Sequence, residues 1–168
     1  MLKTYSLFII KPGFIDKKTA IKDVLEKNEI KVVEEKIERI DPAKLEKHYE
    51  EHQGKHFYGK LMDYMANGKI GSVAFNPTCD VMVVSSERME ETEPEFIART
   101  RSLVEKTIRP IFGLKQGDIY AAAEEFDEIR KTANVIHASD SQASAKREIA
   151  NMFPQFAKQN LCSEEMSR

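Results

Sequence analysis

The residues best suited to chemistry lie in one short stretch towards the C-terminal end. Val135 and Ile136 are strand formers, and His137 follows them directly. Ser139, three residues before Gln142, has the form of a capping box that begins a helix. The sequence therefore predicts an imidazole at a strand end that faces a helix N-terminus, where unpaired backbone N–H groups favour phosphate. A neutral His137 in this place is suited to act as a nucleophile towards phosphorus.

Residues 134–148 read NVIHASDSQASAKRE and closely resemble the active-site signature of nucleoside diphosphate kinases, which more often has the order His-Gly-Ser-Asp-Ser. Weaker landmarks of that family lie between Lys11 and Phe153. They are Lys11-Pro12 at the end of the first strand, His48-Tyr49 on a helix, Phe57-Tyr58 at the start of another helix, and Arg101 to Thr107, which matches the family's Arg-x-x-x-x-x-Thr helix end. The histidine segment is a specific signal, whereas each of the others would be weak alone.

The resemblance implies that the chain moves the terminal phosphate of a nucleoside triphosphate to a nucleoside diphosphate. The mechanism would be ping-pong, through a pros-phosphohistidine at His137. By the same resemblance, Glu148 accepts the proton of the other imidazole nitrogen, Ser139 hydrogen-bonds nearby and Tyr49 approaches the histidine. A lone histidine is more often a hydrogen-bonded core residue, but the helix cap and the family motif together favour the catalytic interpretation.

The remaining expected site residues would bind the nucleotide. By residue type and resemblance they are Lys11, Arg101 and Arg109 on the phosphates, Phe57 stacked on the base, Asn134 on the sugar hydroxyls, and Thr107 near Arg101. Each cation alone is more often a solvated surface charge, and Phe57 fits a core anchor equally well. Mg²⁺ is expected on the phosphates of the nucleotide, so no protein metal site is predicted. Gly54 interrupts the spacing of His48, His52 and His56, which we interpret as a partly solvated helix face.

The sequence departs from the family in its loops. Gly13 and Ala133 replace an aspartate and an arginine, the loop usual between Thr107 and Arg109 is missing, and extra residues occur before the Arg101 helix and after Arg109. A second alignment would put Arg88 and Thr92 in place of Arg101 and Thr107. These departures keep an alternative function open, namely a catalytically impaired nucleotide-binding or assembly module of the same fold.

The elements that must position these residues alternate between strands and helices. The pattern predicts strands at residues 5–10, 31–40, 70–75 and 81–85, a helix that ends near Asn28, a helical hairpin from Asp41 to Asn67, a helix from the Thr92 capping box to Pro110 and Gly113, and a helix at 118–131. The charged strand at 31–40 suits either a sheet edge or a position with one solvated face. The pattern indicates an α/β sandwich. The resemblance implies a ferredoxin-like, mainly antiparallel four-stranded sheet.

Composition limits the remaining possibilities. With 168 residues, 41% hydrophobic and 32% charged, the chain fits one domain, residues 1–168, with a polar, frayed tail from about 155. A net charge of −2 gives no general affinity for nucleic acid or membrane. Cys79 and Cys162 lack metal-binding neighbours, and no signal peptide or apolar span is evident, so we expect free thiols and a cytoplasmic protein. The resemblance implies nucleoside di- and triphosphates as partners and a homo-oligomer, either hexamer or tetramer.

Overall fold

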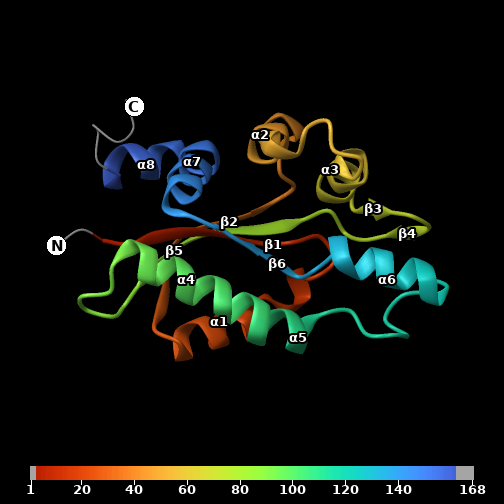
Figure 1. Ribbon diagram of the computed structural model, residues 1–168, viewed down its shortest axis with the longest axis horizontal. Coiled ribbons are helices and arrows are strands. Elements are labelled where there is room, and N and C mark those ends of the chain that lie inside the picture. Colours follow the sequence, from red (N-terminus) through yellow and green to blue (C-terminus); the bar gives the residue numbers. More distant parts are fainter. Residues whose placement is uncertain (1–2, 162–168) are drawn as a thin grey trace.

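The computed structural model describes residues 3–161 and has an antiparallel sheet at its centre (Figure 1). The sheet has four strands in the order β2-β5-β1-β6. Their bounds are Tyr5–Ile10 for β1, Ile30–Glu38 for β2, Cys79–Ser86 for β5 and Ile136–Ala138 for β6. All three strand pairings are antiparallel, so the expected four-stranded antiparallel sheet is confirmed.

The strand positions follow from their residue patterns. Every residue of β1 is buried, as an apolar strand between two neighbours must be. The charged strand β2 lies at an edge, which is one of the two positions that its charges predicted. The short strand β6 forms the other edge, where His137 is paired with Ile9 of β1. Residues directly opposite one another project from the same face, so His137 and Ile9 share a face, as does Lys11 two residues further on.

Helices cover both faces of the sheet (Figure 1). One face carries α2 (Pro42–His48), α3 (Tyr58–Asn67), α7 (Gln142–Met152) and α8 (Pro154–Asn160), and the other carries α1 (Lys18–Lys27) and α4 (Glu93–Leu103). The expected hairpin is present as α2 and α3, and Asp41 caps it by accepting a hydrogen bond from the backbone of Ala43 at 2.8 Å. Within residues 3–161, no helix is both long enough and apolar enough to cross a membrane.

Two predicted elements differ in the structure. Residues 70–75 do not form one strand but a small hairpin of β3 (Lys69–Ile70) and β4 (Val73–Ala74), because Gly71 turns the chain with a φ of 57°. The helix expected at 118–131 starts later, as α6 (Ala123–Thr132). The Glu125 carboxylate of α6 accepts hydrogen bonds from the backbone N–H and hydroxyl of Ser72, at 2.9 and 2.6 Å, which fastens this helix to the small hairpin.

The helix that carries the two candidate arginines ends at Gly113, one of the two residues predicted to end it. It starts at the predicted capping box, in which the Thr92 hydroxyl accepts from the Glu95 backbone and the Glu95 carboxylate accepts from the Thr92 backbone. It then continues through a π-helical turn, Val104–Ile108, into α5 (Arg109–Phe112) and ends at Gly113. Pro110 does not end it, because the wider turn just before the proline accommodates its ring and its missing N–H.

The C-terminal tail is more ordered than its composition predicted. Residues from 155 were expected to fray, whereas α8 packs through Ala157, which has no exposed surface, and through Phe156, whose ring centroid lies 5.2 Å from that of Tyr5. Cys79 is a buried free thiol, and Cys162 lies outside the described residues, as does the rest of the tail.

Candidate active site

The side chains of His137, Ser139 and Glu148 meet where β6 leads into α7. His137 Nε2 lies 2.9 Å from Glu148 Oε1, and Ser139 Oγ donates to the same oxygen at 2.7 Å. Burial alone would raise the pKa of Glu148, but the adjacent His137 and the hydroxyl of Ser139 hold that pKa below its usual value. An ionised carboxylate only accepts hydrogen bonds, so Nε2 carries the imidazole proton and Nδ1 keeps its lone pair.

The helix cap that follows differs from the predicted one. Ser141, not Ser139, is the N-cap of α7, and its hydroxyl accepts from the Ser144 backbone at 3.0 Å. Ser139 instead lies under the imidazole, where its hydroxyl accepts from the Leu7 backbone at 3.0 Å while donating to Glu148. The His137 ring therefore contacts the middle of α7 through Glu148, and Ser139 ties this contact to the central strand β1.

Lys11 and Asn134 come together at the other end of β6. The ammonium of Lys11, only 7% exposed, donates to Asn134 Oδ1 at 2.6 Å. Val135 has a φ of 79°, which is strained for a β-branched residue, and this bend turns the chain sharply between Asn134 and the strand. Burial, with a smaller contribution from the nearby Arg109, lowers the pKa of Lys11 to about 7. Lys11 has no carboxylate partner within residues 3–161, so this buried cation is well placed to meet an incoming anion.

Arg101 and Arg109 lie along the outer edge of β6. They are eight positions apart, which would turn them roughly 80° from one another in a regular α-helix. The π-helical turn between them reduces that angle, and both side chains line one cavity of about 140 Å³ together with Asp140. Arg109 also donates to the Ile136 carbonyl at 3.0 Å, and its buried Nε has no hydrogen-bond partner among the described residues.

Neither Thr107 nor the two residues of the second alignment, Arg88 and Thr92, lie with the two arginines. Thr107 is half-buried in the π-helical turn and lines neither of the two cavities that contain Arg109. Arg88 and Thr92 lie beyond the end of β5 that pairs with Ile30, whereas the other end of β5 pairs with Ile10 beside Lys11. The structure thus brings Arg101 and Arg109, rather than Arg88 and Thr92, to the histidine strand.

His48 is the residue that the sequence interpretation missed. It was placed on a partly solvated helix face, but it is only 4% exposed, and its ring centroid lies 4.7 Å from that of His137. Tyr49 packs edge-on against His48 at 4.6 Å and is itself buried, so it supports His48 behind the nucleophile. The spacing of Leu45, His48 and Tyr49 is that of a buried helical stripe and could have revealed this. Burial first, and then the neighbouring imidazole of His137, lowers the pKa of His48 to about 3.

Phe57 lies just before α3, at the tip of the helical hairpin. It is 37% exposed, which argues against a core anchor, and its ring lies 5.2 Å from that of His52. The Lys55 ammonium lies 5.8 Å from the same ring. A partly exposed aromatic ring on a hairpin tip is available to stack on a planar ligand.

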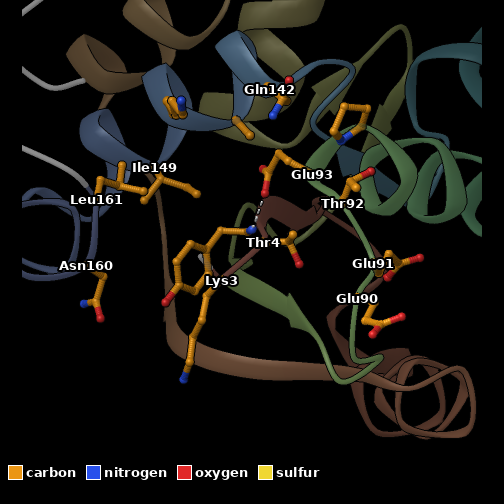
Figure 2. A pocket seen from close by; sticks show the side chains of 14 residues that line it. Lys3, Thr4, Glu90, Glu91, Thr92, Glu93, Gln142, Ile149, Asn160 and Leu161 are labelled. Carbon is orange, nitrogen blue, oxygen red and sulfur yellow. Dashed lines mark hydrogen bonds between the residues drawn. The ribbon is translucent and has the colours of Figure 1, made fainter. Parts of the chain in front are cut away.

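The largest of the described cavities lies away from these residues. It has a volume of about 490 Å³ and is formed by the start of β1, the loop before α4, and helices α7 and α8. Figure 2 shows Glu93 at its wall, where the carboxylate accepts from the Tyr5 backbone at 3.1 Å. Of the candidate site residues, only Thr92 of the second alignment lines it.

Comparisons with known proteins agree with this geometry. Residues 4–157 match the family model described as nucleoside diphosphate kinase. A nucleoside diphosphate kinase from a Thermoanaerobacter species is 34% identical over 155 residues, which cover 90% of this chain and 98% of that protein. The nucleoside diphosphate kinase of Pyrococcus furiosus is 36% identical over 154 residues, which cover 88% of this chain and 81% of that protein.

A crystal structure of the Aquifex aeolicus nucleoside diphosphate kinase has the same fold, with a TM-score of 0.64 and 22% identity. The match covers 92% of this chain and 98% of that one, and it agrees with the expected ferredoxin-like arrangement. The sequence matches and the shared fold extend over nearly the whole described chain, including the strand and helix that hold His137. The chain therefore belongs to the nucleoside diphosphate kinase family.

Proposed function

We propose that the chain is an active nucleoside diphosphate kinase that works through a phosphohistidine at His137. The observation that carries the proposal is the contact of His137 Nε2 with Glu148 Oε1 at 2.9 Å. This contact fixes the proton on Nε2 and leaves Nδ1, the pros nitrogen, as the nucleophile. Nδ1 attacks the terminal phosphorus of a nucleoside triphosphate, the bond to the bridging oxygen breaks, and the nucleoside diphosphate leaves. A second diphosphate then takes the phosphoryl group by the reverse step.

The surrounding cations provide the electrostatic part of this mechanism. A transferring phosphoryl group spreads negative charge over its equatorial oxygens, so positioned positive charge contributes most of the stabilisation. Lys11 and Arg109 both lie near the start of β6, where Lys11 contacts Asn134 and Arg109 contacts Ile136, and each has unfilled hydrogen-bonding capacity or a depressed pKa. Arg101 and Phe57 are partly or fully exposed and would bind the phosphates and the base. Asn134, held by Lys11, would bind the sugar hydroxyls.

Mg²⁺ would enter with the nucleotide. The described residues offer no cluster of carboxylates, since their one group of three potential ligands contains two histidines and a single glutamate. Asp140 and Glu105 line the cavity of the two arginines, and their oxygens suit a hard cation bound mainly by phosphates. When bound, the ion would neutralise charge on the phosphates and orient them.

The proposal is tested by intact-mass analysis after brief incubation with ATP and Mg²⁺. Wild type should gain one acid-labile phosphate, which a different nucleoside diphosphate then removes, and His137→Gln should gain none. His52→Gln is the matched control, because His52 lies on the same side of the site but does not contact Glu148. Nucleotide binding without any transfer to the wild type would overturn the proposal and favour the impaired binding module.

The predictions of a homo-oligomer, a cytoplasmic location and a single domain remain predictions. Size-exclusion chromatography with light scattering measures the first directly, and a monomer at micromolar concentration would contradict it.

A further inference from the structure

Three potential metal ligands from three different elements, one of them His137 itself, lie close together in the candidate active site. His48 comes from α2, His137 from β6 and Glu148 from α7, and one ligand atom of each lies within 4.8 Å of the other two. Within residues 3–161 this is the only group of three histidine, cysteine or acidic side chains gathered so closely. The sheet and the two helices fix all three positions, so the cluster does not depend on a flexible loop.

One of the three ligands has unused bonding capacity. His48 is 4% exposed, and its Nδ1 atom is buried without a hydrogen-bond partner in the described part of the chain. A buried polar atom without a partner costs free energy, so a ligand that fills this position would be favoured. His137 has 20% of its side chain exposed and gives access from the outside.

The ligand types select the kind of ion. Two imidazoles and one carboxylate form a set that binds Zn²⁺ in four-coordinate sites with one position left for water. We propose that His48, His137 and Glu148 bind a divalent transition-metal ion of the Zn²⁺ class. His137 Nε2 is the imidazole nitrogen beside Glu148, so an ion shared with Glu148 would replace the Nε2 proton and draw electron density from the nucleophile Nδ1. A bound ion would therefore slow phosphorylation of His137. This second part rests on the proposed function, whereas the metal site does not.

The same ligands discriminate against the substrate's Mg²⁺. Mg²⁺ requires oxygen ligands in near-octahedral geometry, and this cluster offers only one carboxylate. Millimolar Mg²⁺ should therefore leave a bound transition-metal ion in place. The site would thus allow inhibition by a borderline ion in the presence of the ion that accompanies the nucleotide.

The test is a titration of the purified, unphosphorylated protein with Co²⁺, followed by its visible absorption, and with Zn²⁺, followed by calorimetry. His48→Phe retains a buried ring against His137 but removes both nitrogens, and Glu148→Gln retains the shape but removes the charge. Each should weaken binding by at least roughly tenfold. Thermal unfolding of both variants shows whether they are folded. If His48→Phe does not fold, Glu148→Gln alone tests the site.

His52→Phe is the control, because His52 follows His48 by four residues but lies beyond the end of α2. His52 lies outside the cluster, and its Nδ1 is 3.2 Å from the Lys55 ammonium, so this variant should bind Co²⁺ as the wild type does. Loss of binding in His52→Phe, retention in His48→Phe, or displacement of Co²⁺ by Mg²⁺ would each overturn the proposal.

Phosphorylation separates the two parts of the inference. Protein loaded with Zn²⁺ should gain phosphate on His137 more slowly than metal-free protein, and an unchanged rate would overturn this second part. If the wild type cannot be phosphorylated at all, the proposed function fails, and the titration of the unmodified protein still decides the metal site.

Discussion

Two buried carboxyl groups lie on opposite faces of the sheet, and their pKa values are shifted in opposite directions. Glu148, on the face of His137, is 4% exposed, and Asp80, on the face covered by α1, has no exposed surface. The pKa of Glu148 is held below its usual value by His137 and Ser139 despite its burial. The pKa of Asp80 is raised to about 7 by burial and by the adjacent Glu35.

The difference shows that the partners, and not burial alone, decide whether a buried carboxyl is charged. Glu148 Oε1 has two partners within 2.9 Å, whereas the neighbour of Asp80 is a second carboxyl group, Glu35, which favours the protonated form of Asp80. Lys22 contacts Glu35 directly and lies 3.8 Å from Asp80, so its charge stabilises the carboxylate of Glu35 more than that of Asp80. Glu148 is thus arranged to hold a charge beside the nucleophile, whereas the setting of Asp80 favours its neutral form.

The largest expected effect is on kcat, when the charge of Glu148 is removed. Glu148→Gln retains an oxygen for His137 but replaces a charge-assisted hydrogen bond by a neutral one, which should lower kcat by about tenfold or more. Because Glu148 contacts the imidazole and not the nucleotide, KM should change little. Steady-state kinetics on folded protein would measure both, and an equal loss through KM would contradict this positioning role.

A third buried ion, Lys11, shows what burial does without a carboxylate partner. With a pKa of about 7, Lys11 loses its charge as the pH rises through neutrality, so nucleotide affinity should fall by up to tenfold per pH unit above that value. Lys11→Arg stays charged throughout, and it controls for the titration of the nucleotide phosphate itself. Binding isotherms measured from about pH 6 to about pH 9 should therefore show a steeper fall of affinity with pH for wild type than for Lys11→Arg. Parallel pH dependences would disprove the role of Lys11.

Removing the hydroxyl that supports Glu148 should affect stability. Ser139→Ala leaves the Leu7 N–H without its partner and takes one hydrogen bond from Glu148, which should lower the free energy of unfolding by about 1–3 kcal/mol. Ser141→Ala removes only the helix cap and should cost about 1 kcal/mol. Urea denaturation of both variants tests the assignment, which would be wrong if Ser141→Ala were the more damaging.

The smallest effect is expected on the opposite face. Since the folded-state pKa of Asp80 is raised, its stabilising contribution is complete below about pH 4, its unfolded pKa, and is lost as the pH rises through about 7. Asp80→Asn should flatten this dependence and raise Tm at pH 8 by about 2–4 °C, the shift that relief of about 1 kcal/mol gives in a domain of this size. A lower Tm for Asp80→Asn at pH 8 would show that Asp80 is ionised and favourably paired with Lys22.

The local parts of the site were predictable from the sequence. The Thr92 capping box, the Asp41 cap and the buried strand that ends at Lys11 are short-range patterns, and each is present in the structure. The N-cap of α7 was not predicted correctly, because Ser139 and Ser141 both fit the pattern of a helix cap. Only the hydrogen bond from the Leu7 backbone, across the sheet, shows that Ser139 is used elsewhere and that Ser141 caps the helix. Composition likewise predicted a frayed tail, because it cannot show that Phe156 packs against Tyr5.

The sequence by itself determined the residue types of the catalytic segment, the order of strands and helices, and the family to which they belong. Only the tertiary structure decided that His48 lies against His137, that a π-helical turn brings Arg101 and Arg109 to one cavity, and that Asp80 and Glu148 differ in charge. The physical reason is that helix caps and strand patterns depend on neighbours a few residues away. Burial and electrostatic partners depend on residues that are distant in sequence and meet only when the sheet is assembled.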